Sequence, residues 1–356
     1  MEPDFLEQHD KRLTAAFAEA VPEALIVVTP DARILAANQK ARMLFPRLKA
    51  PDLLAMHVRV PAILDGVARV AKSGVMTSVS WAERVPVERW FNVTITPVQD
   101  APLQPSIVLY VQELTEARRV ERMRVDFIAN ASHELRTPLA SLLGFVETLQ
   151  GAAKDDPKAR ATFLNIMRDQ GQRMARLVDD LLSLSKIEQN LHVRPEKPVD
   201  LAALVRHVAD SLGMVAADAH VTLNIAPHDP VIVPGDRDEL LRVIENLLEN
   251  AIKYGARDDG TPTQVDVTLS VTTDDVRLDV RDYGRGIARE HLPRLTERFY
   301  RVDPGQSRAK GGTGLGLAIV KHIVAHHRGR LKIDSELGAG TKFSVTLPLH
   351  KTTKNI

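Results

Sequence analysis

The sequence predicts a multidomain α+β protein in which a small mixed domain, a pair of long helices and an α/β sandwich follow one another. Three observations predict this order. Short apolar runs alternate with turn residues over residues 14–115, two apolar stripes with helical spacing occupy residues 116–192, and helical segments alternate with strands over residues 199–350. A chain of 356 residues is long enough for two or three domains with separate cores.

The first domain, residues 14–115, is predicted to be a small α+β domain. The residues Thr29-Pro30-Asp31 lie between two apolar runs and indicate a hairpin. Pro97, Pro102 and Pro105 are expected to lie outside central strands, because proline has no backbone N–H to donate. The expected strands and helices are Leu25–Val28, Ile34–Ala37, Trp90–Ile95, Ile107–Val111, Gln39–Phe45 and Ala62–Ser73.

Residues 116–192 are predicted to form a hairpin of two long helices, with a turn between Gly151 and Pro157. The first apolar stripe consists of Val120, Met123, Phe127, Ala131, Leu135, Pro138, Leu142, Phe145 and Leu149. The second consists of Phe163, Met167, Met174, Leu177, Leu181 and Leu184. One hairpin covers both stripes poorly, whereas two copies packed as a four-helix bundle cover them well. The pattern therefore predicts a homodimer.

The first of these helices carries a candidate reactive histidine. His133 lies on the face opposite the apolar stripe, Glu134 is its neighbour, and Thr137 follows one turn later. An exposed imidazole is a good nucleophile toward a γ-phosphate when a carboxylate accepts its proton. Thr137 could orient a water molecule for the reverse, phosphatase-type reaction. The alternative is an ordinary solvated histidine, and Pro138 is expected to bend the helix.

Residues 199–350 alternate helices with apolar strands, which predicts a sandwich of helices on an antiparallel sheet. On one predicted helix, Asn246, Asn250 and Lys253 share a face. Amide oxygens suit a hydrated Mg²⁺, and a lysine suits phosphate oxygens. The expected elements are Leu201–Leu212, Val221–Ile225, Asp238–Tyr254, Val265–Thr272, Val276–Asp282, Leu315–His326, Leu331–Ser335 and Phe343–Pro348.

Three further motifs follow in this region. A buried Asp282 could accept a hydrogen bond from an adenine amino group, and Gly284 and Gly286 let the backbone approach the base. The glycine-rich run at residues 311–317 leads into a helix, where backbone N–H groups bind phosphate. It matches neither a P-loop nor a dinucleotide-binding fingerprint. A turn at residues 338–341 completes the set, and the polar stretch Val302–Lys310 is expected to form a mobile lid.

The string Ser132–Leu139, S-H-E-L-R-T-P-L, resembles the phosphoacceptor box of sensor histidine kinases at every position. The later motifs resemble the N, G1, F, G2 and G3 boxes of the Bergerat-type ATPase fold shared by histidine kinases, gyrase B, Hsp90 and MutL. The resemblance implies autophosphorylation of His133 by ATP, with Asn246 and Asn250 serving Mg²⁺ and Asp282 binding adenine. The residues implied to line the nucleotide are Lys253, Tyr254, Gly284, Gly286, Tyr300, Arg301, Gly312, Thr313, Gly314, Leu315, Gly316, Leu317 and Thr341.

The same resemblance implies a homodimeric protein-histidine kinase that passes its phosphoryl group to an aspartate of a response-regulator receiver domain and also acts as a phosphatase. Residues 17–115 resemble a PAS domain, with Glu113-Leu114-Thr115 where many such domains carry D-I-T. The domain order and the segments Asp126–Asn130 and Leu295–Asp303 resemble proteobacterial phosphate-regulon sensor kinases, which implies phosphate-responsive signalling. One departure is Arg328, which stands where the kinase pattern A-H-G-G has a glycine.

The composition limits other functions. With 44% hydrophobic and 26% charged residues and a formal net charge of +1, nothing indicates direct binding of nucleic acid. The absence of cysteine excludes disulfides and thiolate metal sites and fits a reducing cytosol. No apolar run reaches the about 18–20 residues that span a bilayer. We expect the chain as given to be cytoplasmic, or to be the cytoplasmic part of a longer inner-membrane protein.

Two alternative functions stay open at this stage: a non-kinase ATPase of the same fold, and a signalling scaffold dominated by phosphatase activity. His133 and its string argue against the first, and intact Glu134, Asn250 and Asp282 argue against the second. A further alternative is a metal pair at His322 and His326, four residues apart on a helix. We do not expect it, because no third ligand is evident in the sequence.

Overall fold

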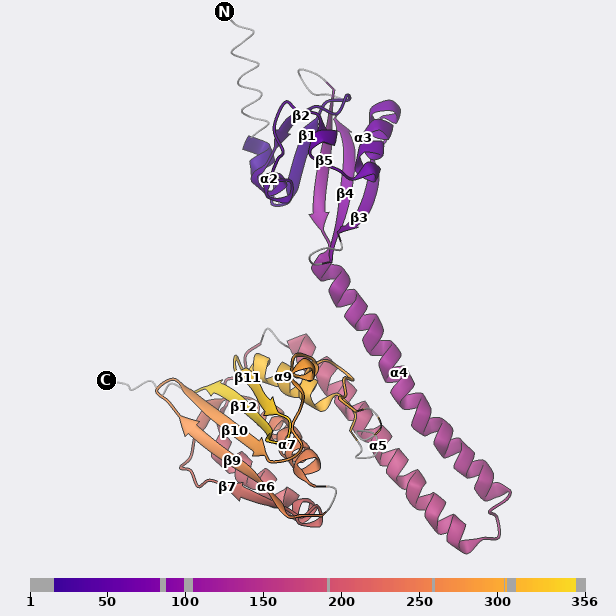
Figure 1. Cartoon of the computed structure of the whole chain (residues 1–356), viewed down its shortest axis with the longest axis vertical. Coiled ribbons are helices and arrows are strands. Elements are labelled where there is room, and N and C mark those ends of the chain that lie inside the picture. Colours follow the sequence, from indigo (N-terminus) through magenta and orange to yellow (C-terminus); the bar gives the residue numbers. More distant parts are fainter. Residues whose placement is uncertain are drawn as a thin grey trace, which may run out of the picture. The chain divides into compact units, whose positions relative to one another are not determined.

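The computed structural model describes residues 16–83, 88–98, 105–190, 193–257, 260–303, 305 and 312–349. The chain divides into two compact units, Met1–Asp126 and Phe127–Ile356. The first holds a single mixed sheet-and-helix core, and the second holds most of the helical hairpin together with a larger sandwich (Figure 1).

The N-terminal unit is built on a five-stranded antiparallel sheet with the strand order β2-β1-β5-β4-β3. Helix α3 packs against β3, β4 and β5, and the core lies between them around Ile26, Ile95 and Leu109. The elements are β1 (Ala24–Val28), β2 (Ile34–Ala37), α2 (Gln39–Leu44), the 3-10 helix η1 (Leu54–Met56), α3 (Pro61–Ser73), β3 (Thr77–Glu83), β4 (Arg89–Val98) and β5 (Ser106–Glu113).

The prediction that Pro97 lies outside a strand was wrong. Pro97 lies in β4, opposite Ile107 of β5. The neighbouring strand β3 begins at Thr77, opposite Ile95, so beyond Ile95 no strand among the described residues pairs with the other edge of β4. The missing N–H of Pro97 therefore faces an edge that needs no donor there. Strand β3 was not predicted, because it contains few apolar residues.

Two long helices, α4 (Thr115–Gln150) and α5 (Pro157–Asn190), form the hairpin. Most of the predicted apolar positions are only half-buried, and Pro138, Leu177 and Leu184 are the fully buried ones. Val120 and Met123, which were assigned to the first stripe, are exposed. Other large apolar side chains on the hairpin are exposed as well, including Leu139 (47%), Leu143 (57%) and Leu182 (65%). Such exposed apolar side chains indicate a surface that is covered in an assembly.

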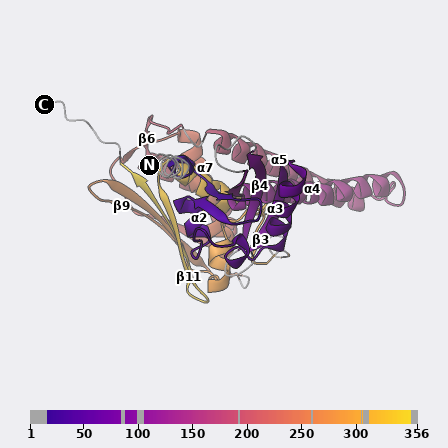
Figure 2. The ribbon, with the colours of Figure 1, turned by 90° about the horizontal axis from the view of Figure 1, so that it is seen from above.

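The C-terminal sandwich is a five-stranded sheet with the order β11-β12-β10-β9-β7, on which helices α6, α7 and α9 pack (Figures 1 and 2). The sheet is mixed rather than antiparallel as predicted, because β7 pairs in parallel with β9. The elements are β6 (Pro198–Asp200), α6 (Leu201–Asp218), β7 (Val221–Ile225), β8 (Ile232–Pro234), α7 (Arg237–Gly255), β9 (Thr263–Val271), β10 (Asp275–Asp282), the 3-10 helix η2 (Arg289–Arg294), α9 (Gly316–His326), β11 (Arg330–Glu336) and β12 (Gly340–Pro348).

Local sequence explains how α7 is placed. Asp236 caps its N-terminus by accepting hydrogen bonds from the backbone N–H groups of Asp238 and Glu239. Leu240, Ile244, Leu247 and Leu248 then bury one face of the helix against the sheet and α6. The opposite face is left for polar side chains.

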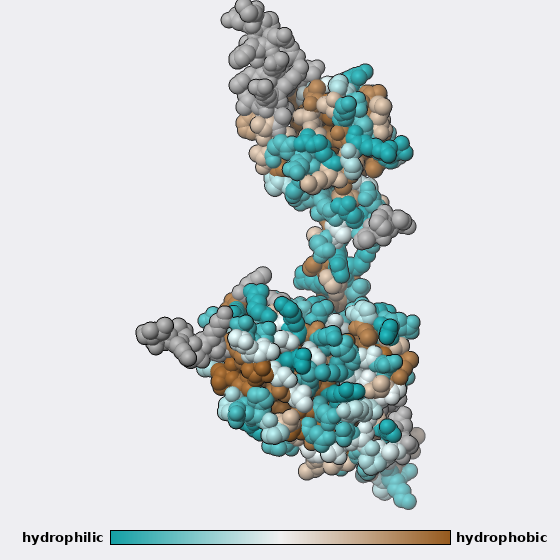
Figure 3. Space-filling view, turned by 60° about the vertical axis from the view of Figure 1, so that its left-hand side comes forward, coloured by the Kyte–Doolittle hydropathy of each residue, from teal (hydrophilic) through white to brown (hydrophobic). Residues whose placement is uncertain are grey.

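Within the part of the chain that the structure describes, we find no helix with the length and apolarity needed to cross a membrane. On the face shown in Figure 3, hydrophobic side chains form separate patches in a mainly hydrophilic surface.

Candidate functional site

The predicted reactive turn lies in the middle of α4. His133 is exposed, as predicted from its position opposite the apolar stripe. The hydroxyls on either side of it bond back to the helix: Ser132 Oγ donates to Ile128 O (2.8 Å) and Thr137 Oγ1 donates to His133 O (3.3 Å). Pro138 lies within the helix and cannot donate to the carbonyl four residues earlier.

Glu134 is held by arginines. The Arg301 guanidinium donates to both carboxylate oxygens, from Nη1 to Oε1 (3.1 Å) and from Nη2 to Oε2 (2.9 Å). Arg173 of α5 donates to Oε2 (3.4 Å). The Glu134 side chain is 15% exposed and that of Arg301 only 6%. A bidentate arginine–carboxylate contact with so little solvent access is among the stronger polar contacts in proteins.

A cavity of about 510 Å³ opens beside this contact. It collects residues from all four predicted nucleotide motifs and from α5. The predicted residues that line it are Asn246, Asn250, Lys253, Tyr254, Asp282, Gly286, Tyr300, Arg301, Gly312, Thr313, Gly314, Gly316, Leu317 and Thr341. Gly284 and Leu315 are buried and do not line the cavity, and His133, Glu134 and Thr137 are not part of the lining either.

Helix α7 presents its polar face to this cavity. Asn246 Nδ2 donates to the carbonyl of Arg242 (2.8 Å), which fixes the amide, and its Oδ1 lies close to Gly316 of the glycine-rich run. Lys253 forms an ion pair with Glu249 one turn earlier (2.8 Å). The amide oxygens on this face suit a hydrated divalent cation next to phosphates.

Asp282 is buried at the end of β10, with 3% of its surface exposed. Its Oδ1 accepts hydrogen bonds from the backbone N–H groups of Gly284 (3.0 Å) and Thr341 (3.2 Å). Burial raises the pKa of Asp282, and the two N–H groups oppose that rise in part. A carboxylate fixed in this way at a cavity wall can accept a hydrogen bond from an amino group on a planar base.

The glycines of this region permit close backbone contacts. Gly286 has φ +69°, and a Cβ at this position would lie 1.9 Å from the carbonyl oxygen of Glu336. The glycine-rich run is tied to the preceding segment, because Phe299 N donates to Gly314 O (2.8 Å) and Arg301 Nη2 donates to the carbonyls of Gly312 (3.0 Å) and Thr313 (2.8 Å).

The predicted lid at Val302–Lys310 lies mostly outside the described residues. Residues 304 and 306–310, and Gly311 of the glycine-rich run, are among those not described. Val302 and Asp303 line the cavity. Arg298, in the segment before the lid, forms an ion pair with Glu188 of α5 and is not among the residues that line the cavity.

Several lining residues were not predicted. Arg242 lies one turn before Asn246 on the same face of α7, so helical spacing could have identified it. Arg176, Asp179 and Asp180 come from α5 and carry no local signal. Asp180 accepts hydrogen bonds from Arg242 Nη2 (2.5 Å) and Thr313 Oγ1 (2.8 Å).

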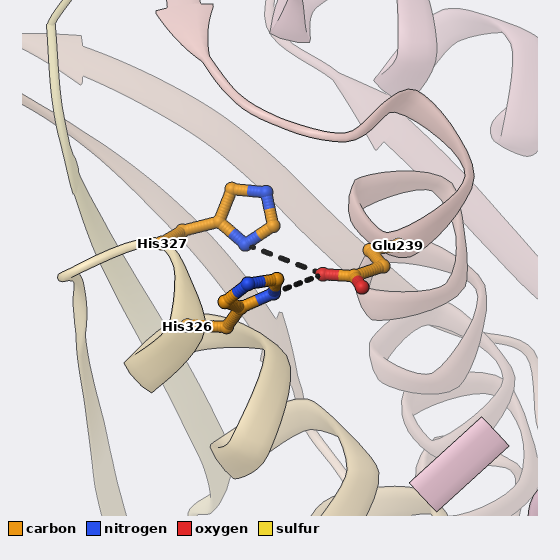
Figure 4. Close-up of side chains that lie close together, drawn as sticks. All are labelled: Glu239, His326 and His327. Carbon is orange, nitrogen blue, oxygen red and sulfur yellow. Dashed lines mark hydrogen bonds and ion pairs between the residues drawn. The ribbon is translucent and has the colours of Figure 1, made fainter. Parts of the chain in front are cut away.

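A second polar cluster consists of Glu239, His326 and His327, whose potential ligand atoms lie within 4.8 Å of one another. Figure 4 shows both imidazole rings directed at one carboxylate oxygen of Glu239. His327 Nε2 accepts from Asp236 N (3.0 Å), so its proton is on Nδ1, which bonds to Ile323 O (2.8 Å). Burial lowers the pKa of His327, which favours this neutral form. Since both nitrogens are engaged, His327 has no lone pair for a metal.

His326 instead joins two segments. Its Nδ1 bonds to Glu239 Oε2 (2.8 Å) and its Nε2 to the carbonyl of Val193 (2.6 Å). The cluster therefore ties the end of α9 to the start of α7 and to the segment after α5. The Nε2 atom of His322 lies 3.6 Å from Oε1 of Glu188, and His322 does not belong to the cluster that contains His326.

Comparison with known proteins identifies two domains. Residues 123–190 match the His Kinase A (phospho-acceptor) domain, and residues 235–351 match the histidine kinase-, DNA gyrase B- and HSP90-like ATPase. The solved structure of the histidine kinase ThkA in complex with the response regulator protein TrrA has 21% sequence identity and a TM-score of 0.51, and covers 94% of this chain and 98% of that one. This likeness concerns the fold alone.

Two curated relatives extend the comparison. The phosphate regulon sensor protein PhoR of Pseudomonas aeruginosa is 38% identical over 239 residues, which are 67% of this chain and 53% of that protein. The sensor protein kinase WalK of Staphylococcus saprophyticus is 35% identical over 253 residues, 71% of this chain and 41% of that protein. The chain thus spans about half the length of these relatives. From its phospho-acceptor domain, its ATPase domain and these relatives, the chain belongs to the sensor histidine kinases.

Proposed function

We propose that this protein is an ATP-dependent protein-histidine kinase that phosphorylates its own His133 and passes the phosphoryl group to an aspartate of a response-regulator receiver domain. The observation that carries the proposal is the position of the cavity. Motifs separated by about a hundred residues in the sequence line one pocket beside the helix that bears His133, and Arg301 of that pocket contacts Glu134 directly.

In the proposed reaction, an imidazole nitrogen of His133 attacks the γ-phosphorus, the bond from phosphorus to the bridging oxygen breaks, and ADP leaves. Glu134 accepts the imidazole proton. Asp282 orients the adenine, while Lys253, Tyr254, Tyr300, Arg301, Thr341 and the run Gly312–Leu317 hold the phosphates and the base. In the structure Glu134 is still bound by Arg301 and Arg173, so this contact must open before the reaction.

Asn246 and Asn250 are the proposed Mg²⁺ ligands, and the residues present fit that ion. Both line the cavity, and the Asn246 amide is fixed with its oxygen toward the glycine-rich run. When bound, Mg²⁺ neutralises charge that develops on the phosphate oxygens.

The proposed active form is a homodimer, supported by the exposed leucines of the hairpin at positions 139, 143 and 182. Dephosphorylation of the partner regulator is proposed to need Thr137, whose hydroxyl must leave His133 O to orient a water molecule.

The N-terminal unit is proposed to be a PAS-like relay, supported by its five-stranded antiparallel sheet. Similarity to a phosphate regulon sensor supports phosphate-responsive signalling.

The test uses the full chain with radiolabelled ATP and Mg²⁺. We expect acid-labile, base-stable label, its absence in His133→Gln, and normal labelling of the control His207→Gln, which changes an exposed histidine on α6. Equal labelling of His133→Gln would refute the assignment. Asn250→Ala should abolish labelling. Thr137→Ala should retain labelling and lose phosphatase activity toward the phosphorylated regulator.

A further inference from the structure

Two carboxylates of the helical hairpin accept hydrogen bonds from side chains that line the proposed nucleotide cavity. Glu134 of α4 binds the Arg301 guanidinium through both oxygens, at 3.1 and 2.9 Å. Asp180 of α5 accepts from the hydroxyl of Thr313, at 2.8 Å, and from Arg242, at 2.5 Å. Arg301 and Thr313 both line the cavity. All four contacts lie within the C-terminal compact unit.

Carboxylate and phosphate oxygens present the same acceptors to an arginine fork and to a hydroxyl. Each N–H or O–H bond vector that points at a hairpin carboxylate cannot also point at a phosphate. Arg301 and Thr313 therefore satisfy either the hairpin or a bound phosphate chain, but not both with the same donors.

While Glu134 holds the Arg301 guanidinium, one hydrogen-bond donor of Arg301 has no acceptor within the described part of the chain. Its side chain is 6% exposed, and its Nε is buried without a hydrogen-bond partner among the described residues. A buried unsatisfied N–H of a charged group is costly, and an acceptor at the cavity wall would remove that cost. This second observation indicates that the arginine is shaped for a ligand that makes more bonds than the hairpin provides.

We infer that the helical hairpin and the phosphate chain of the nucleotide compete for Arg301 and Thr313, so that Glu134 and Asp180 form a lock that nucleotide binding opens. The inference rests on the proposed ATP site. The carboxylates act as substitutes for phosphate oxygens, and the closed lock withholds Glu134, the proposed proton acceptor, from His133. Nucleotide binding takes Arg301 away from Glu134 and releases Asp180 from Thr313, so that the same event fills the pocket and frees the carboxylate.

A competing internal ligand weakens nucleotide binding by the fraction of molecules in which the lock is open. Removing the charge of Asp180 raises that fraction. For Asp180→Asn in the full chain we expect the dissociation constant for Mg²⁺ and the non-hydrolysable analogue AMPPNP, measured by isothermal titration calorimetry, to fall about tenfold. Glu134→Gln, on the other helix, should act in the same direction.

The matched comparison is Asp179→Asn, which removes the same charge from the neighbouring residue of α5, also in the cavity wall. Its change in affinity measures the repulsion between a wall carboxylate and the phosphates. The gain in Asp180→Asn should be several times larger, because Asp180 is the residue that holds Thr313 and Arg242. An equal gain in both aspartate variants would mean general electrostatic repulsion and would overturn the lock. Unchanged or weaker binding in Asp180→Asn and Glu134→Gln would also overturn it, since both residues would then only support the pocket.

The same binding measurements distinguish a failure of the proposed ATP site from a failure of the lock. If the parent chain and all variants bind no AMPPNP, the ATP site itself is wrong and the lock falls with it. If the parent binds and Asn250→Ala does not, the site stands, and the aspartate comparison decides the lock alone.

Discussion

Replacing Arg328 by glycine is expected to stabilise the C-terminal sandwich. Helix α9 ends at His326, and Arg328 follows with φ +57°, in the left-handed region. Two hydrogen bonds define the ending: Arg328 N donates to Ala325 O (3.0 Å) and Gly329 N donates to Val324 O (2.8 Å). This is the pattern of a Schellman motif, in which the left-handed position is usually a glycine.

The magnitude follows from two opposing terms. A left-handed conformation costs a residue with a Cβ about 1–2 kcal/mol. Glycine removes that cost but has more freedom in the unfolded chain, which costs about 0.4–1 kcal/mol. The Arg328 side chain is exposed, so its loss removes little packing. The net gain in free energy of unfolding should be about 0.5–1 kcal/mol, or about 2 °C in Tm.

Thermal unfolding of the full chain, followed by circular dichroism, measures this change. Both tryptophans, Trp81 and Trp90, lie in the N-terminal unit, so their fluorescence reports the other transition and should not move. Gly329→Ala is the opposite control, because its Cβ would lie 2.5 Å from Thr346 O and should destabilise the sandwich. A Tm for Arg328→Gly at or below that of the parent would refute the argument that this turn is strained.

Three other changes have defined outcomes. Because burial raises the pKa of Asp282, its carboxylate gains a proton at a higher pH than an ordinary aspartate does. The affinity for ATP, measured by calorimetry, should therefore decline as the pH is lowered and Asp282 becomes protonated. An Asp282→Asn variant whose affinity declined identically with pH would count against this. Leu139→Glu combined with Leu143→Glu should convert the dimer to monomers in sedimentation velocity, and a persistent dimer would assign the contact elsewhere. His326→Phe removes the partner of Glu239 and should lower the free energy of unfolding, measured by urea denaturation, by about 3 kcal/mol. Adding Glu239→Leu should recover much of that loss. An undiminished loss in the double variant would show that the ion pair is not the cause.

The elements that the sequence predicts well are those with strong local signals. The face of α7 that carries Asn246 and Asn250 follows from spacing alone, and the structure places both residues at the cavity. The exposure of His133 likewise follows from its angle around the helix. In each case, residues a few positions apart determine the result.

Features that depend on distant partners could not be predicted in this way. Asp180 belongs to a helix whose sequence has the pattern of an ordinary amphipathic segment. The hydrogen bond from Thr313 to Asp180 joins residues 133 positions apart. The parallel pairing of β7 with β9 and the place of Pro97 in β4 depend on which strands become neighbours. Hydrophobic periodicity does not carry that information.

The hydrogen bonding around His133 also determines how α4 responds to force. Pro138 leaves the Glu134 carbonyl without the amide that a regular helix would supply, while the Thr137 hydroxyl adds a bond to the His133 carbonyl. The ladder of backbone bonds is therefore weakened within one turn of His133, the proposed phosphoacceptor, and helices bend most easily at such a point. A tilt or twist applied to one end of α4 would be absorbed at this turn, so the imidazole would change its direction while the flanking helical segments stay straight.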